Sequence, residues 1–246
     1  MPREAAVPAG PLALVGGDEM RPGNEEQDRI LVEAAALGPA FVLATAAGRQ
    51  RPELAVAGAT SWFGALGLTV EELPAVRRRD ANSLSVAARA WSGRFFYLVG
   101  GDPGLVPAIL AGTPLWEAVL GAWRDGAALA GSSAGAMALG AWTLIRDRRP
   151  GATARRYRPV LGVVPRVAVV PHLETFGRKW IPGVIEGSRV NGALPLGIDE
   201  RSAALWLDRR WRAVGPGTVM VFAADGAERR FGGGEEIEGL PQPDIV

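Results

Sequence analysis

The segment that decides the fold reads Ala127-Ala-Leu-Ala-Gly-Ser-Ser-Ala-Gly-Ala136 and continues to Leu139. Residues 127–131 are small and apolar, which predicts a buried strand, and residues 134–139 predict the start of a helix. Only two serines separate these elements, so the strand must pass into the helix through a tight turn. Repeated units of this kind are typical of a parallel sheet covered by helices.

The same alternation precedes this segment and changes after it. Strands are predicted at 11–17, 40–45, 67–70 and 94–101, and helices at 24–37, 51–64, 81–91 and 103–124, with Asn24 as the N-cap of the first. Beyond residue 160 short strands joined by glycine and proline turns are predicted at 160–170, 195–198, 203–207, 211–214, 218–222 and 228–231, with helical spacing over 174–189. This pattern predicts an α/β fold: helices on both faces of a mostly parallel sheet, with a small antiparallel C-terminal addition.

Composition excludes several classes of site. The 246 residues include no cysteine and one histidine, His172, which excludes disulfides, thiolate metal sites, cysteine nucleophiles and multi-histidine metal centres. The net charge of +1 gives no reason to expect nucleic acid as a partner, and no apolar run is long enough to span a membrane. We expect a single cytoplasmic domain over 1–246, loose at 1–10 and 233–246, without metal or cofactor.

The turn at 131–135 is where chemistry is expected. It has the pattern Gly131-x-Ser133-x-Gly135 between a strand and a helix, the context of a nucleophile elbow. A serine on such a sharp turn needs neighbours without side chains, and the turn lifts its hydroxyl to the carboxyl edge of the sheet. The alternative is a turn rich in glycine and alanine that only permits close packing.

A nucleophilic serine needs a base, and His172 is the single imidazole available. It follows the apolar run Val169-Val170-Pro171, which places it at the end of a strand, where sites in α/β sheets collect. The alternative is a structural, hydrogen-bonded histidine.

The base in turn needs a carboxylate to orient it. Glu200 is the first candidate, because it follows the strand predicted to end at Ile198; a surface pair with Arg201 is the alternative. Other candidates for the acid are Asp147, Asp199 and Glu174.

A second strand end carries Gly100-Gly101-Asp102. Its bare amides could hold an oxyanion together with the Ala134 N–H. Asp102 could equally cap a helix that begins at Pro103, and both interpretations can hold together.

These segments together resemble the aspartyl dipeptidase and cyanophycinase family of serine peptidases. The resemblance runs from about residue 11 to 222 and rests on Leu14-Val-Gly-Gly17, Gly100-Gly-Asp102, Gly131-Ser-Ser-Ala-Gly-Ala136, Pro171-His172 and Gly197-Ile-Asp-Glu200. It implies a flavodoxin-like, three-layer fold related to class I glutamine amidotransferases. It also implies a Ser–His–acid mechanism, with Ser133 as nucleophile, His172 as base and Glu200 as acid, although an Asp between Ser and His, near Asp147, has been proposed in the dipeptidase branch.

Departures from the family concern its substrate residues. Pro103 stands where many members have Gln, and Val170-Pro171 precede His172 where cyanophycinases have Asp-Gln. Of the arginines that follow the histidine there, only Arg178 has a counterpart here. We expect hydrolysis of a small acidic, Asp-containing peptide or a cyanophycinase-like substrate, with Asp102 and Arg178 as substrate-binding residues, Trp180 as a possible cleft residue and a possible homodimer. An inactive binding or scaffold protein and an esterase that uses Asp147 are the alternatives.

Overall fold

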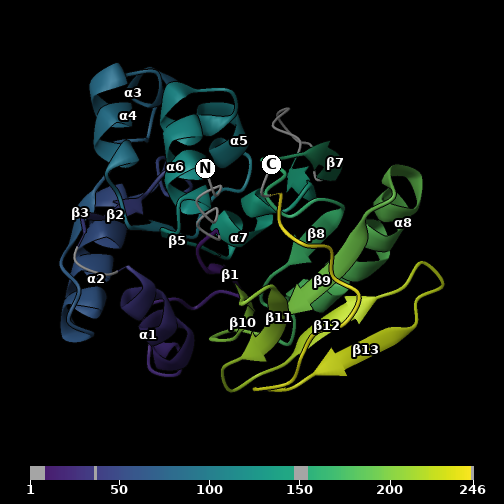
Figure 1. Ribbon diagram of the computed structural model, residues 1–246. Coiled ribbons are helices and arrows are strands. Elements are labelled where there is room, and N and C mark those ends of the chain that lie inside the picture. The colour runs from purple at the N-terminus through teal and green to yellow at the C-terminus, as the bar shows by residue number, and fades with distance from the viewer. Residues whose placement is uncertain (1–8, 36–37, 147–154, 245–246) are drawn as a thin grey trace, which may run out of the picture.

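The computed structural model describes residues 9–35, 38–146 and 155–244, and its central feature is a seven-stranded sheet (Figure 1). Five strands are parallel and adjacent: β1 (Leu12–Val15), β5 (Ala128–Ser132), β4 (Phe95–Leu98), β2 (Ala40–Leu43) and β3 (Val70–Glu72). On the other side of β1, the strands β10 (Ala203–Leu207) and β11 (Arg210–Val214) extend the sheet in antiparallel fashion. The mostly parallel sheet is as predicted.

Side chains alternate between the two faces of this sheet. The residues of each strand therefore divide into two sets, and each set packs against the helices on its own face. Along β4, Phe96 and Leu98 pack with α3 (Arg78–Ala81), α4 (Leu84–Trp91), α5 (Leu105–Leu110), α6 (Pro114–Arg124) and α7 (Ala134–Leu139). Phe95 and Tyr97 pack instead with α1 (Glu25–Ala34) and α2 (Pro52–Ala65). Figure 1 shows these helices on opposite sides of the strands. The strands are therefore buried on both faces, which explains their continuous apolar runs.

A second sheet follows the first and has four strands. Its order is β13 (Glu228–Phe231), β12 (Val219–Phe222), β9 (Leu194–Ile198) and β8 (Val167–Val170). A 3-10 turn η1 (Gly177–Trp180) and α8 (Ile181–Asn191) connect β8 to β9. The pair β8–β9 is parallel, whereas the pairs made by β12 are antiparallel. The antiparallel addition was predicted; this parallel pair within it was not.

The hairpin of β6 (Trp142–Arg146) and β7 (Arg155–Pro159) was also not predicted. Trp142 stacks on Tyr157 across it with ring planes 3° apart, so aromatic cross-strand packing stabilises this pair. Within 160–170, a strand forms only at Val167–Val170.

The C-terminal segment, which was expected to be loose, makes hydrogen bonds to the rest of the protein over residues 233–244. Ile237 is 3% exposed, and its N–H donates to the carbonyl of Trp211. The indole of Trp211 donates to the Pro241 carbonyl, and the Asp244 N–H donates to Val163. Two apolar residues in a run rich in Gly, Glu and Pro, Ile237 and Leu240, pack against the core, and backbone hydrogen bonds join the segment to β11. At the other end, Gly10 exchanges hydrogen bonds with Trp123.

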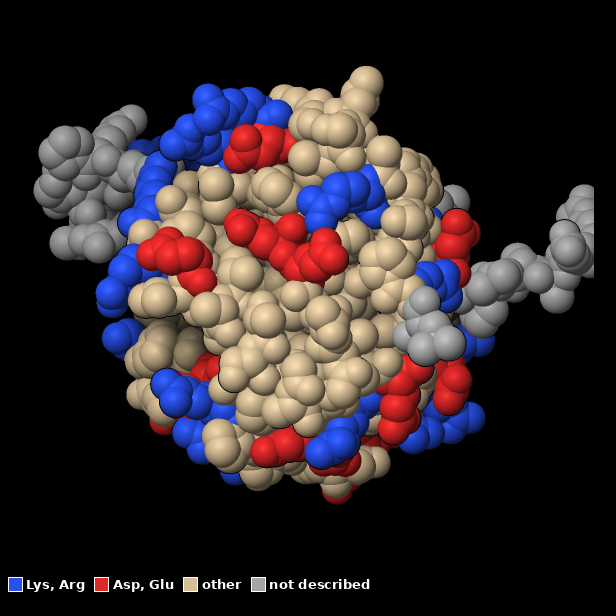
Figure 2. Space-filling view, turned by 90° about the vertical axis from the view of Figure 1, so that its left-hand side faces the viewer, with Lys and Arg blue, Asp and Glu red and all other residues tan. Residues whose placement is uncertain are grey.

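Helix α2 has an unusual surface for a helix of a globular protein. Its buried residues are Ala59 and Phe63, Leu54 is 53% exposed, and Glu53 is its one charged residue. Figure 2, the view from this side of the molecule, shows a broad area without charge bordered by side chains of both signs. Among the helices that the structure describes, none is long and apolar enough to cross a membrane.

Candidate active site

Ser133 lies between β5 and α7 in a strained backbone conformation, with φ 49° and ψ −111°. The two glycines of the motif are needed for close packing around this turn. A Cβ on Gly131 would lie 2.5 Å from the Gly135 carbonyl carbon, and a Cβ on Gly135 would lie 2.3 Å from the Leu98 carbonyl oxygen. The turn therefore has the geometry that a nucleophile elbow requires, and the serine side chain remains partly exposed.

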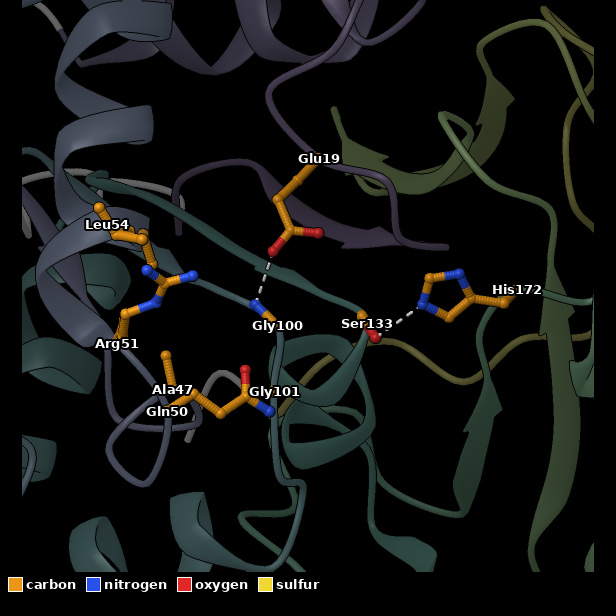
Figure 3. Close-up of a pocket in the computed structure, with 10 residues that line it drawn as sticks. Glu19, Ala47, Gln50, Arg51, Leu54, Gly100, Gly101, Ser133 and His172 are labelled. Atoms are coloured by element: carbon orange, nitrogen blue, oxygen red, sulfur yellow. Dashed lines mark hydrogen bonds between the residues drawn. The ribbon is translucent and has the colours of Figure 1, made fainter.

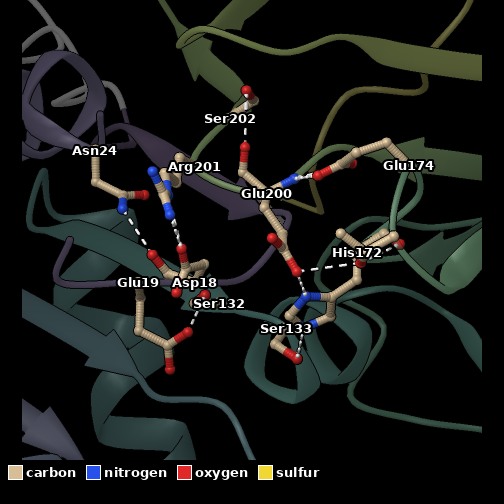
Figure 4. Close-up of polar contacts among 11 residues, drawn as sticks. Asp18, Glu19, Asn24, Ser132, Ser133, His172, Glu174, Glu200, Arg201 and Ser202 are labelled. Carbon is tan, nitrogen blue, oxygen red and sulfur yellow. Dashed lines mark hydrogen bonds and ion pairs between the residues drawn. The ribbon is translucent and has the colours of Figure 1, made fainter. Parts of the chain in front are cut away.

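Ser133, His172 and Glu200 form a continuous hydrogen-bonded chain (Figure 4). Ser133 Oγ lies 2.9 Å from His172 Nε2, and His172 Nδ1 lies 2.7 Å from Glu200 Oε1. Because an ionised carboxylate can only accept, Nδ1 carries the hydrogen and Nε2 is left to accept from the serine. The structure thus brings together the three residues that the sequence singled out.

Parallel pairing of β8 and β9 places the histidine next to the carboxylate. Val170 is in register with Gly197, so the chain leaves both strands at the same edge, with His172 two residues beyond β8 and Glu200 two residues beyond β9. Thr175 Oγ1 donates to Glu200 Oε1 at 3.1 Å and helps to fix the carboxylate. The site therefore draws on strand ends from both sheets.

The other candidate acids have different partners. Asp199 Oδ2 accepts from the N–H and hydroxyl of Thr218. Glu174 accepts from the Glu200 N–H at 3.0 Å, and burial together with the neighbouring Asp199 raises the pKa of Glu174. Glu174 thus supports the backbone of Glu200 and does not contact the imidazole. Asp147 lies outside the described residues.

The N-terminal loop after β1 organises the backbone of all three segments. Three consecutive carbonyls, those of residues 15–17, accept hydrogen bonds from the N–H groups of Ser133, His172 and Arg201 at 3.0, 2.7 and 2.9 Å. Gly17, with φ 110°, lies against the imidazole, and a Cβ there would approach the ring Cε1 to 2.2 Å. The imidazole also stacks on Phe176 at a centroid distance of 4.6 Å. A bare backbone and an aromatic face therefore both restrict the position of the ring.

The expected oxyanion donors lie on either side of the serine. Gly101 lines the cavity in front of Ser133, and Ala134 is the next residue in the chain. Within the described part of the chain, neither N–H donates a hydrogen bond to another group. The Gly100 N–H, in contrast, donates to Glu19 Oε1 at 2.7 Å and is occupied.

A cavity of about 630 Å³ opens in front of Ser133 and His172, a size suited to a small ligand (Figure 3). Its wall is formed by Glu19, Ala47, Gln50, Arg51, Leu54, Ala55, Gly100 and Gly101. Arg51 supplies the one Lys or Arg side chain among the described lining residues, and Figure 3 shows it pointing into the cavity. No group of described side chains has the composition of a metal site.

The predicted substrate-binding residues are not part of this wall. Arg178 points away, with NH1 3.1 Å from Glu228 Oε1 and NH2 against the sulfur of Met220. Asp102 accepts from the Gly104 N–H at 2.9 Å and lies 3.5 Å from Arg49. The helix expected to begin at Pro103 begins at Leu105 with Gly104 as its N-cap, so Asp102 does not cap it as expected. Trp180 packs edge-on against Phe176 behind the imidazole.

Sequence reasoning missed Glu19, Gln50 and Arg51. Glu19 lies two residues after the Gly16-Gly17 strand end, and Gln50 and Arg51 lie in the loop that follows β2. Each follows the carboxyl end of a parallel strand, and that position was the available signal.

Comparisons with known proteins show the family and the fold of this chain. The model of peptidase family S51, the aspartyl dipeptidase and cyanophycinase family, matches residues 12–207. This chain belongs to peptidase family S51. The match supports a serine peptidase. A comparison with curated protein sequences gave no match.

Among solved structures, the S51 chain is similar to a peptidase from an acI-B1 Actinobacterium. The two share 28% identity with a TM-score of 0.78, over 94% of this chain and 98% of the other. A peptidase E-like protein from Listeria monocytogenes EGD-e is 18% identical with a TM-score of 0.59, over 84% of this chain and 98% of that one, and shows the shared fold. The α/β fold expected for the family is thereby confirmed.

Proposed function

We propose that the protein is a serine peptidase that cleaves an amide bond through an acyl-enzyme, with Ser133 as nucleophile, His172 as general base and Glu200 as the acid that orients it. The hydrogen-bonded chain Ser133–His172–Glu200 carries this proposal. The Ser133–His172 distance of 2.9 Å is within the range in which a base can take the proton of a nucleophile, and the His172–Glu200 distance of 2.7 Å allows the carboxylate to orient the base. The strained elbow and the free amides beside it support the same assignment.

The reaction proceeds in two half-reactions. Ser133 Oγ attacks the carbonyl carbon while His172 Nε2 takes its proton, and the Gly101 and Ala134 N–H groups stabilise the oxyanion. The C–N bond then breaks, and the imidazolium gives its proton to the leaving amine. In the second half, His172 takes a proton from water, the hydroxide attacks the acyl ester, and Ser133 leaves with the proton. Glu200 stabilises the imidazolium in both halves.

For the substrate, we propose a small peptide that carries a carboxylate. Arg51 provides a cation inside the cavity, and Gln50 beside it provides an amide donor. Arg51 takes the place that Arg178 was expected to fill, since Arg178 is paired with Glu228. A guanidinium is the natural partner of a carboxylate because its donors match both oxygens.

The alternatives are less well supported. A scaffold protein that had lost turnover would not need a serine within 2.9 Å of its base. The esterase hypothesis used Asp147 as the acid, and the Nδ1 that this acid would contact is taken by Glu200 at 2.7 Å.

A peptide panel tests the proposal. Wild type and Ser133→Ala are incubated with α-Asp-X dipeptides, β-Asp-Arg, neutral dipeptides and a simple ester, and the products are measured by mass spectrometry. We expect wild type to release amino acids from an acidic peptide and Ser133→Ala to release none. Equal release by both would exclude Ser133 as the nucleophile, preference for neutral peptides would exclude the acidic substrate, and cleavage of the ester alone would favour an esterase.

A further inference from the structure

Glu19 joins the two segments that carry the oxyanion donors. Its Oε1 accepts from the Gly100 N–H at 2.7 Å, and its Oε2 accepts from the Ser132 hydroxyl at 2.8 Å. Gly100 precedes Gly101, and Ser132 precedes Ser133 and Ala134. One carboxylate thus contacts the residue before the loop donor and the residue before the nucleophile (Figures 3 and 4).

The loop that carries Glu19 is held in an unusual conformation. Asp18 and Met20, on either side of it, have φ values of 52° and 58°, in the left-handed region that costs energy for residues with a side chain. Asp18 pairs with Arg201 at 2.6 Å. Asn24 is the N-cap of α1, as predicted, but its side chain makes no cap hydrogen bond, and its Nδ2 donates instead to the carbonyls of Asp18 and Arg21.

This loop leaves Glu19 at a defined place with little freedom. It is anchored by Asn24 on one side and by the carbonyls of residues 15–17 on the other, which also hold the backbone of the Ser133 and His172 segments. Strain that is maintained by surrounding hydrogen bonds is characteristic of functional sites. The strain here orients one carboxylate toward two donors.

We propose that Glu19 is a positioning residue, whose carboxylate sets the distance between the Gly100–Gly101 turn and the Ser133 elbow so that the Gly101 and Ala134 N–H groups converge on one oxyanion. This inference rests on the proposed function. The Gly100 N–H can only donate and therefore needs an acceptor oxygen, whereas the Ser132 hydroxyl donates to Glu19 here and could also accept. Because Glu19 accepts from the Gly100 N–H, the N–H of this turn that remains to face the substrate is that of Gly101.

The alternative role is direct contact with substrate, because Glu19 also lines the cavity and could hold an ammonium group. The two roles predict different kinetics. An oxyanion donor acts in the transition state, so its displacement lowers kcat, whereas loss of an ammonium contact raises KM.

The test compares four variants with wild type on the cleaved peptide of the panel. Glu19→Ala removes both contacts, and we expect kcat to fall about 100-fold with KM within about threefold. Ser132→Ala removes one contact, and we expect a fall in kcat of roughly fivefold to tenfold. Glu19→Gln keeps the Gly100 contact and can donate to Ser132, so we expect kcat within about tenfold of wild type. Glu26→Gln, an exposed carboxylate change on α1, is the control and should leave both constants unchanged.

A second readout needs no peptide. A fluorophosphonate reacts when Ser133 Oγ forms a bond to phosphorus, fluoride leaves and His172 takes the proton, and its phosphoryl oxygen occupies the oxyanion site. We expect intact mass spectrometry to show labelling of Ser133 that is about 100-fold slower in Glu19→Ala than in wild type. Circular dichroism and thermal unfolding show which variants are folded.

The outcomes separate the two proposals. An increase in KM alone, or kcat and labelling rates in folded Glu19→Ala equal to wild type, overturns the positioning role while the peptidase stands. If Glu19→Ala does not fold, an unchanged kcat in Ser132→Ala overturns it. A wild type that neither cleaves the panel nor reacts at Ser133 removes the proposed function, and the role of Glu19 with it.

Discussion

At the scale of single residues, the first prediction concerns which carboxylate orients the imidazole of His172. Glu200 contacts His172 Nδ1 at 2.7 Å, whereas Asp147 remains the alternative from its place between Ser133 and His172 in the chain. Glu200→Gln keeps the shape but removes the charge that stabilises the imidazolium, so we expect kcat to fall about 10³-fold to 10⁴-fold.

Asp147→Asn is the matched comparison for this prediction. Steady-state kinetics on the same peptide should show kcat within about twofold of wild type, since His172 Nδ1 already has Glu200 as its partner and the exchange alters one atom. A large loss in Asp147→Asn with full activity in Glu200→Gln would assign the acid to Asp147.

A second prediction at this scale concerns Gly17. A methyl group there would meet His172 Cε1 at 2.2 Å, so Gly17→Ala must move the imidazole or the loop. Gly67→Ala is its control, because Gly67 also has a positive φ, 89°, but nothing lies within 4 Å of its added Cβ. Both variants should lose about 1–2 kcal/mol of unfolding free energy through backbone strain.

Activity should separate the two glycine variants. We expect kcat/KM to fall at least 100-fold in Gly17→Ala, since a displacement of about 1 Å in a reacting group has this effect, and to stay near wild type in Gly67→Ala. Measured kcat/KM and thermal unfolding of both proteins check this. Full activity in Gly17→Ala would show that contact with Gly17 does not position the imidazole.

At the scale of elements, the start of α2 supplies the positive charge of the cavity wall. Arg51 precedes Pro52, the first residue of α2, and is the cation of the cavity wall. Arg51→Gln should raise KM for acidic peptides about 10-fold to 100-fold and change kcat little, because a substrate charge is bound equally in ground and transition states. Arg178→Gln, which breaks a surface pair with Glu228, should change neither constant. A raised KM in Arg178→Gln with an unchanged KM in Arg51→Gln would assign the substrate contact to Arg178.

The sequence alone was sufficient to predict those helices and strands whose local pattern of apolar residues agrees with their burial in the folded protein. The strands β1, β2, β4 and β5, the break between α5 and α6 at 112–114, and α7 at Ala134–Leu139 were predicted from an apolar run or a Gly-Thr-Pro break. The strand predicted at 67–70 forms instead at Val70–Glu72, where two of the three residues are exposed glutamates. The hairpin β6–β7 was not predicted, because the strand Arg155–Pro159 is mostly exposed and has three arginines. Its stability comes from cross-strand stacking, which no local pattern shows.

The catalytic candidates were predictable for a related reason, and the cavity wall was not. Ser133, His172 and Glu200 each follow a strand, and strand ends of parallel pairs share an edge. Arg178 was chosen because it is close to His172 in sequence. The η1 turn carries it toward Glu228 instead, while Arg51 reaches the site from a separate strand end about 120 residues earlier. Proximity in the chain says little about which side chains face a cavity.

At the scale of the whole molecule, stability should depend on a carboxyl group buried beneath the site. Asp28 on α1 is 0% exposed, its Oδ2 accepts from the Trp62 indole of α2 at 2.7 Å, and its Oδ1 is a buried oxygen with no partner among the described residues. The pKa of Asp28 is raised from 3.8 to about 7: burial is the largest cause, the Trp62 hydrogen bond opposes the shift, and the nearby Glu19 and Glu25 add to it. The folded protein therefore holds this proton more tightly than the unfolded chain.

The sign of the pH effect follows from this raised pKa. Below about pH 4 Asp28 is protonated in both states; between pH 4 and 7 only the folded state retains the proton, so its contribution to stability falls as pH rises and is lost above pH 7. Urea unfolding of wild type and Asp28→Asn at pH 5 and pH 8 measures this. We expect the free energy of wild type relative to Asp28→Asn to fall by on the order of 2 kcal/mol between the two pH values.

Glu26→Gln, an exposed carboxylate in the same turn of α1, is the control, and its difference from wild type should not change with pH. A constant difference between wild type and Asp28→Asn would mean that Asp28 is ionised in the folded protein throughout. The Trp62 hydrogen bond would then be enough to stabilise its charge between α1 and α2, and the layer under the active site would be more polar than its apolar neighbours indicate.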